Sequence, residues 1–201
     1  MSHRYADIAF TPTIRALQQQ LGSRELYARL DIGPDKNHRF RAREADFIRQ
    51  RNSVYMATVT EDGWPYIQHR GGPDGFVKVL DDGTLGIADY SGNRQYISTG
   101  NLVHNDRVSL FFMDYPQRKR LKLLGRVETL SAEDERLALL ADPDYPANVE
   151  RGFLIHLTAF DWNCPQHITP RYTRQEIQPL IDQAVQQALT EPATNLNPLA
   201  T

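Results

Sequence analysis

The stretch Ser53–Arg70, SVYMATVTEDGWPYIQHR, decides the fold of this chain. Two runs rich in β-branched and aromatic residues flank the dipeptide Asp62-Gly63, a pattern that is typical of a β-hairpin. Residues 76–90, FVKVLDDGTLGIADY, repeat the pattern around Asp82-Gly83. The sequence therefore predicts four antiparallel strands in two hairpins, joined by the glycine-rich loop 71–75.

Three further runs extend the predicted sheet. RVSLFFMDY (107–115) and RKRLKLLGRVETL (118–130) predict two strands around the turn at Tyr115-Pro116, and GFLIHLTAFDW (152–162) predicts a last strong strand. The βαβ spacing of a Rossmann fold is absent. We therefore expect an α+β protein built on an antiparallel β-barrel, because closure removes the exposed edges of such strands.

Helices are predicted between and around these strands from apolar spacing and capping residues. They cover residues 11–21, 23–30, 44–51, 93–105, 131–140 and 173–189, and residues 191–201 are expected to form a loose tail. We expect one domain over residues 1–201. It has a helical N-terminal extension over about 1–52 and a C-terminal helix and tail over about 173–201.

Composition excludes several classes of protein. The 201 residues contain 40% hydrophobic and 24% charged residues, which is typical of a globular domain. The 23 Lys and Arg against 25 Asp and Glu give a net charge of −2, so nucleic acid and anionic membranes are not expected as partners. No signal peptide or apolar run of about 20 residues is found, and the single Cys164 suits a reducing compartment. We expect a cytoplasmic protein.

Two clusters of cations indicate a candidate anion site. Ser91-Gly92-Asn93 precede a predicted helix whose first turn would carry Arg94, and helix N-termini attract anions. Arg70 and Lys78 would converge if their strands pair across the loop 71–75. Ordinary helix capping and a solvated barrel face are the alternatives for each cluster alone, but the two together favour a phosphorylated ligand.

Other polar residues carry less information. Arg39, Arg41 and Arg43 form a basic run for which a solvated surface is the simpler interpretation. The histidines show no metal-binding spacing, so no metal is expected. Cys164 is interpreted as a small hydrophobic residue rather than a nucleophile.

Four segments in order resemble the pyridoxamine 5'-phosphate oxidase-related FMN-binding proteins. They are QHRGGPDGFVKV, DYSGNRQYISTGNL, RLKLLGRVE and DWNCPQHITPRY, and the resemblance covers roughly residues 10–175. It implies an FMN-binding split β-barrel that acts as a homodimer, with two flavins at the subunit interface and a small-molecule substrate.

The resemblance also implies a set of cofactor-binding residues. On the strands these are Gln68, His69, Arg70, Val77 and Lys78; in the loop they are Tyr90, Ser91, Asn93, Arg94 and Gln95; from the partner subunit it is Arg120; and Trp162 covers the pocket on the cofactor side. Asn93-Arg94-Gln95 is similar to the phosphate-binding Ser-Arg-Lys run of the oxidase, with one cation fewer. Arg120 stands where the oxidase has a Gln near the flavin ring.

One departure from the family pattern bears on the substrate. PQHITPRY (165–172) stands where the oxidase has an Arg-Leu-His-Asp-Arg run for the substrate phosphate, so pyridoxamine phosphate is a doubtful substrate. We interpret the chain as an FMN-dependent oxidoreductase that acts between a reductant, NAD(P)H being a candidate, and a small acceptor. A flavin store or redox sensor, a deazaflavin F420-dependent relative and a haem-binding relative are the alternatives. No catalytic acid or base is identified.

Overall fold

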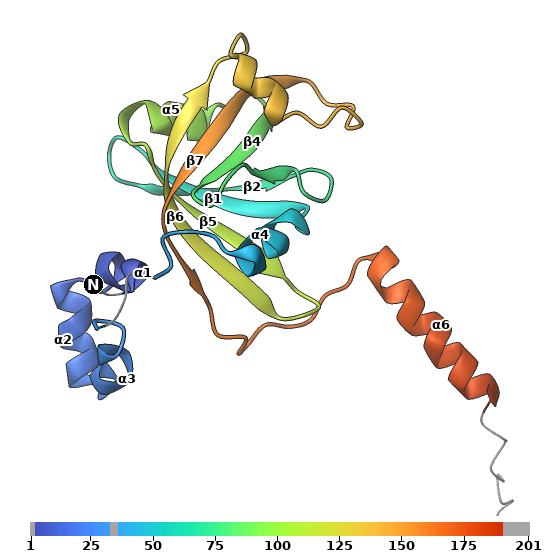
Figure 1. Ribbon diagram of the computed structural model, residues 1–201, viewed down its shortest axis with the longest axis horizontal. Coiled ribbons are helices and arrows are strands. Elements are labelled where there is room, and N and C mark those ends of the chain that lie inside the picture. Colours follow the sequence, from blue (N-terminus) through green and yellow to red (C-terminus); the bar gives the residue numbers. More distant parts are fainter. Residues whose placement is uncertain (1–2, 33–35, 191–201) are drawn as a thin grey trace, which may run out of the picture. The chain divides into compact units, whose positions relative to one another are not determined.

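The computed structural model describes residues 3–32 and 36–190 (Figure 1). The chain falls into two compact units. The first combines the residues up to 114 with residues 119–165, and the second combines residues 115–118 with those from 166 onward. The predicted tail 191–201 lies outside the described residues. The organisation as one domain stays a prediction.

Seven strands of the first unit form one antiparallel sheet. They follow one another in the order β2-β1-β5-β6-β7-β4-β3. Figure 1 shows the sheet curling on itself, so the predicted α+β fold with a split β-barrel is confirmed. The strands are β1 Ser53–Val59, β2 Pro65–Gly71, β3 Val77–Val79, β4 Thr84–Tyr90, β5 Arg107–Asp114, β6 Lys119–Leu130 and β7 Val149–Trp162.

The three predicted hairpins are present as β1–β2, β3–β4 and β5–β6. The predicted pairing of β2 with β3 is wrong, because these two strands form the opposite edges of the sheet. The loop between them is bonded to the segment before β1 instead. The Gly72 amide donates to the Asn52 carbonyl oxygen over 3.1 Å, and the Gly75 amide donates to the Arg51 carbonyl oxygen over 3.1 Å.

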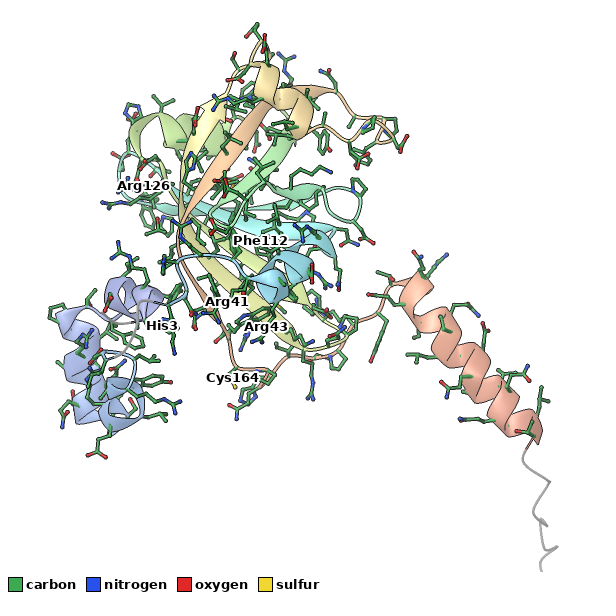
Figure 2. All side chains as sticks on the ribbon, in the orientation of Figure 1. His3, Arg41, Arg43, Phe112, Arg126 and Cys164 are labelled. Carbon is green, nitrogen blue, oxygen red and sulfur yellow. The ribbon has the colours of Figure 1, made fainter. Side chains whose placement is uncertain are left out.

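Alternate positions of the strands fill the interior. In β5 the buried residues include Val108, Leu110 and Phe112, the last of which is labelled in Figure 2. α4 (Ala42–Arg49) adds Phe47 and Ile48 to the same cluster. The barrel core therefore extends from the sheet to the helix that precedes it.

The remaining helices of the first unit are mostly where the sequence predicts them. They are α1 Arg4–Ala9, α2 Pro12–Gln20, α3 Arg24–Ala28 and α5 Ile97–His104, and η1 (Glu135–Leu139) is a 3₁₀ helix. α1 was not predicted. α5 begins four residues later than predicted, because Arg94 and Tyr96 have φ values of 56° and 55° and a left-handed backbone cannot continue an α-helix.

The second unit is dominated by α6 (Arg174–Thr190). A capping box begins it: the Thr173 amide donates to Glu176 Oε2 over 2.7 Å, and the Glu176 amide donates to Thr173 Oγ1 over 3.2 Å. The predicted helix 173–189 is confirmed. Within the described ranges, no helix combines the length and the apolar character that crossing a membrane requires.

Candidate functional site

A cleft lies beside β2, β4 and the segment that enters α5. It encloses about 60 Å³. Six residues that the sequence singled out line it: Gln68, Arg70, Tyr90, Asn93, Arg94 and Gln95. The other lining residues are Tyr66, Asp89, Gly92, Tyr96, Ile97, Ser98, Thr99 and Glu150.

The loop before α5 presents Arg94 to this cleft. Arg94 does not lie in the first turn of the helix, as predicted, but three residues before it, with φ 56°. Its Nε donates to the Tyr96 hydroxyl over 3.0 Å, and this bond raises the pKa of the exposed guanidinium. The Gln95 amide donates to Asn93 Oδ1 over 3.2 Å, which fixes the turn.

A buried ion cluster forms the floor of the cleft. Arg70 Nη1 lies 2.5 Å from Asp89 Oδ1, and Arg151 Nε lies 3.5 Å from Asp89 Oδ2. The side chains of Arg70, Asp89 and Arg151 are only 10%, 16% and 17% exposed. Arg151 also pairs with Glu150 over 2.7 Å, so two cations meet two carboxylates. The formal charges of the cluster balance.

One donor of this cluster has no acceptor. Arg70 Nε is buried and makes no hydrogen bond to any described residue. A buried donor without an acceptor costs about 1–3 kcal/mol. An anion that reaches this nitrogen would remove that cost, so the residues present suit a phosphate group.

Neutral side chains complete the polar wall. Gln68 Oε1 accepts from Ser98 Oγ over 2.9 Å and from Arg70 Nη2 over 3.4 Å, which orients the Arg70 fork. Burial, followed by the Asp142 carboxylate and Tyr145, raises the pKa of the Tyr90 hydroxyl. Tyr90 therefore stays protonated at neutral pH and can donate a hydrogen bond.

Four of the predicted strand and loop residues do not line the cleft: His69, Val77, Ser91 and Lys78. His69 alternates with Gln68 and Arg70 along β2 and packs edge-on against Tyr55, with 5.6 Å between ring centroids. Val77 is fully buried in the core, and the Ser91 amide donates to the Asn148 carbonyl oxygen over 2.8 Å.

The expected convergence of Arg70 and Lys78 on one anion is wrong within the chain. Lys78 Nζ lies 3.9 Å from Asp142 Oδ2, whereas Arg70 pairs with Asp89. The reason is the topology: β2 and β3 lie at opposite edges of the sheet and do not pair.

Arg120 and Trp162 do not line the cleft either. Arg120 donates from Nε and Nη2 to the Cys164 carbonyl oxygen over 3.1 and 2.7 Å. The Trp162 indole N–H donates to Glu44 Oε1 over 2.7 Å. Any part that these two residues play at the cleft therefore requires a second copy of the chain.

Sequence reasoning missed Asp89, Arg151 and Tyr66. Tyr66 lies two and four residues before Gln68 and Arg70 on the same strand, so alternation along β2 could have identified it. Asp89 is the register partner of Arg151 across β4 and β7. That register was not visible in the sequence. Among the residues that the structure describes, no group of three or more His, Cys, Asp or Glu could hold a metal ion.

The substitution Asp89→Ala should lower the free energy of unfolding by about 3–5 kcal/mol, because it leaves two buried arginines without their shared carboxylate. Chemical denaturation measures this loss. Asp106→Ala is the matched control: Asp106 pairs with Arg126 at the surface, so it should cost about 1 kcal/mol or less. Equal losses in the two variants would show that the cluster does not hold the sheet.

Comparison with known proteins gives the family. The family model described as pyridoxamine 5'-phosphate oxidase matches residues 40–154. No curated protein matches the chain. Among solved structures, a candidate pyridoxamine 5'-phosphate oxidase from Lactobacillus delbrueckii is 21% identical, with a TM-score of 0.50 over 63% of this chain and 96% of that chain. HupZ from Group A Streptococcus is 18% identical, with a TM-score of 0.50 over 66% and 99%.

These two structures share the fold, and at these identities the likeness extends no further. The family model, in contrast, spans more than half of the sequence and includes β1 to β6 and every residue that lines the cleft. The chain belongs to the pyridoxamine 5'-phosphate oxidase family.

Proposed function

We propose that this protein is an FMN-binding oxidoreductase that transfers hydride or electrons between a reductant, with NAD(P)H as the candidate, and a small acceptor. The observation that carries the proposal is the buried and unpartnered Nε of Arg70 in a cleft that also presents the exposed Arg94. Two guanidinium groups at one small cleft suit a single terminal phosphate. Membership of the family supports the choice of a flavin.

The proposed roles of the cleft residues follow from their contacts. Arg94 supplies a charge that the Tyr96 hydroxyl holds in place, and Arg70 supplies a fixed donor on the floor. The hydroxyl of Thr99 and the side-chain amide of Asn93 line the same space and can donate to phosphate oxygens. Gln95 adds a neutral donor where the oxidase has a cation. The bound flavin would supply the electron transfer.

The size of the cleft supports a homodimer with shared sites. About 60 Å³ is far below the roughly 300–1,000 Å³ of small-molecule pockets, so one chain holds the phosphate end but does not enclose a flavin. We place the flavin ring against Arg120 of the partner subunit. A guanidinium near the ring would stabilise the anionic reduced flavin. Trp162 is the residue that the family resemblance suggests on the cofactor side of the pocket.

Pyridoxamine phosphate is not the proposed substrate. Residues 165–172, PQHITPRY, offer one Arg and one His, separated by three residues. A substrate with a second phosphate would be poorly compensated by such a segment. A small acceptor without a phosphate fits the proposal better.

The protein should purify with FMN, and Arg94→Ala should raise the Kd for FMN by about 10- to 100-fold, the usual effect of losing a charged hydrogen bond. Quenching of flavin fluorescence during titration measures the Kd. Arg107→Ala, which removes an exposed arginine outside the cleft, is the control and should leave the Kd unchanged. A protein that takes up no FMN, or equal affinities in both variants, would contradict the proposed site.

Reduction of the flavin tests the oxidoreductase activity. NADH or NADPH, added without oxygen to the FMN-loaded protein, should bleach the flavin absorbance within seconds, because typical turnover numbers are about 1–1,000 per second. A quinone-like acceptor should then restore the absorbance. Bleaching only over hours with both nucleotides would favour a flavin store or sensor. Rapid oxidation of pyridoxamine phosphate would overturn the proposed substrate class.

Shared sites can be tested by mixing subunits. In a purified heterodimer of an Arg94→Ala chain and an Arg120→Ala chain, one of the two sites should contain both arginines and the other neither, because of two-fold symmetry. We expect half of the sites to bind FMN with the affinity of the unmodified protein. Two sites that are each weakened, one lacking Arg94 and the other lacking Arg120, would mean that each chain builds its site alone.

A further inference from the structure

A second cavity in the first unit is much larger than the cleft. It encloses about 520 Å³, within the roughly 300–1,000 Å³ of small-molecule pockets. The segment Lys36–Glu44, the turn at Asp82 and the end of β7 line it. It shares no lining residue with the cleft. It is therefore a separate candidate binding site.

The wall of this cavity is positively charged. Four cationic side chains, those of Lys36, Arg39, Arg41 and Arg43, face two carboxylates, those of Glu44 and Asp82. The resulting excess of two positive charges opposes the net charge of −2 on the whole chain. Such a wall favours an anion over a cation or a neutral ligand.

Both carboxylates are already engaged. Asp82 pairs with Arg39 over 2.7 Å. Glu44 is buried, and it accepts from the Trp162 indole over 2.7 Å and from the Arg41 backbone amide over 3.2 Å. Of the carboxylates in the described ranges, none forms an ion pair with the side chain of Arg41 or Arg43. These two guanidinium groups are the ones that can take up an anionic ligand.

Aromatic rings form the other part of the wall. Phe160 and Phe40 stack with their centroids 6.0 Å apart, and both line the cavity. The Trp162 ring lies beside them, with the Arg43 guanidinium 4.3 Å from its centroid. A ligand with a planar ring finds apolar surface here next to the unpaired cations.

We propose that this cavity binds a nucleotide-type ligand, with its phosphates on Arg41 and Arg43 and its planar ring against the aromatic wall. Figure 2 shows both arginines at the start of α4, where Arg41 is the N-cap and Arg43 lies in the first turn. The proposal uses none of the cleft residues, but it shares Trp162 with the residues that the family resemblance assigns to the flavin, so competition with FMN is part of its test. It revises the interpretation of the basic run 39–43 as a merely solvated surface.

The two tryptophans of the chain allow a direct test with ADP as the probe. Trp64 is 74% exposed and lies outside the cavity, so Trp64→Phe leaves Trp162 as the only indole without disturbing the core. Titration of this variant with ADP should change the Trp162 fluorescence in a saturable way. Adenosine and inorganic phosphate, each carrying half of the proposed recognition, should bind at least about tenfold more weakly. Calorimetry on the unmodified protein provides an independent Kd.

Charge variants distinguish binding of ADP in this cavity from a general electrostatic attraction of anions to the protein. Arg41→Gln with Arg43→Gln should raise the Kd for ADP by at least about tenfold, since each lost charged contact weakens binding and both residues are exposed. Arg107→Gln with Arg126→Gln removes the same charge from the surface near β5 and β6 and should leave the Kd unchanged. Circular dichroism should show all variants folded.

Three outcomes would overturn the proposal. The first is no fluorescence change with millimolar ADP, the second is equal weakening by the two pairs of substitutions, and the third is competition of FMN with ADP for the cavity. Titrations are therefore run with and without saturating FMN. If FMN fails to bind while ADP binds, the flavin proposal falls and this one stands.

Discussion

The carboxylate of Asp89 is the constraint on which the barrel and the cleft depend. It lies on β4 and pairs with Arg70 of β2 and with Arg151 of β7. β2 is an edge strand, and four strands separate it from β4 in the sheet, so no backbone ladder joins the two. Because the three side chains are largely buried, separating them would leave charges unpaired in a poorly solvated interior. The ion cluster thus holds the curled sheet at the place where hydrogen bonding between strands stops.

Because of this constraint, the two arginines at the cleft differ in how they can contribute to ligand binding. Arg70 is bound to Asp89 and rests 4.8 Å from the Phe153 ring centroid, so its position is fixed, and Nε is its one nitrogen without an acceptor among the described residues. Arg94 is exposed on a loop and is held only by Tyr96. Substitution of Arg70 would therefore weaken both the fold and the binding of a ligand, whereas substitution of Arg94 would weaken ligand binding alone. This difference makes Arg94 the better probe of phosphate binding.

Local patterns made much of this fold predictable. Asp62-Gly63 and Asp82-Gly83 identify two hairpins because turn chemistry acts over a few residues, and the alternation in β5 identifies its buried face. The pairing of distant edges has no such local signal, which is why β2 and β3 were wrongly expected to pair. The start of α5 was misplaced for a related reason. Arg94 and Tyr96 adopt left-handed φ values that neither residue type favours, so the surrounding structure must impose them.

The position of Trp162 links the N-terminal segment to the end of β7. Its indole N–H is bonded to Glu44, its ring meets Phe47 edge-on with centroids 4.8 Å apart, and Arg43 covers the ring. With these contacts made inside its own chain, the indole has no further N–H to offer a flavin on a neighbouring subunit. The half-buried Arg120 side chain donates to a backbone carbonyl and, among the described residues, pairs with no carboxylate, so it retains its charge for such a contact. In the proposed dimer the electrostatics of the flavin ring therefore depend on Arg120, while Trp162 fixes the wall of the second cavity.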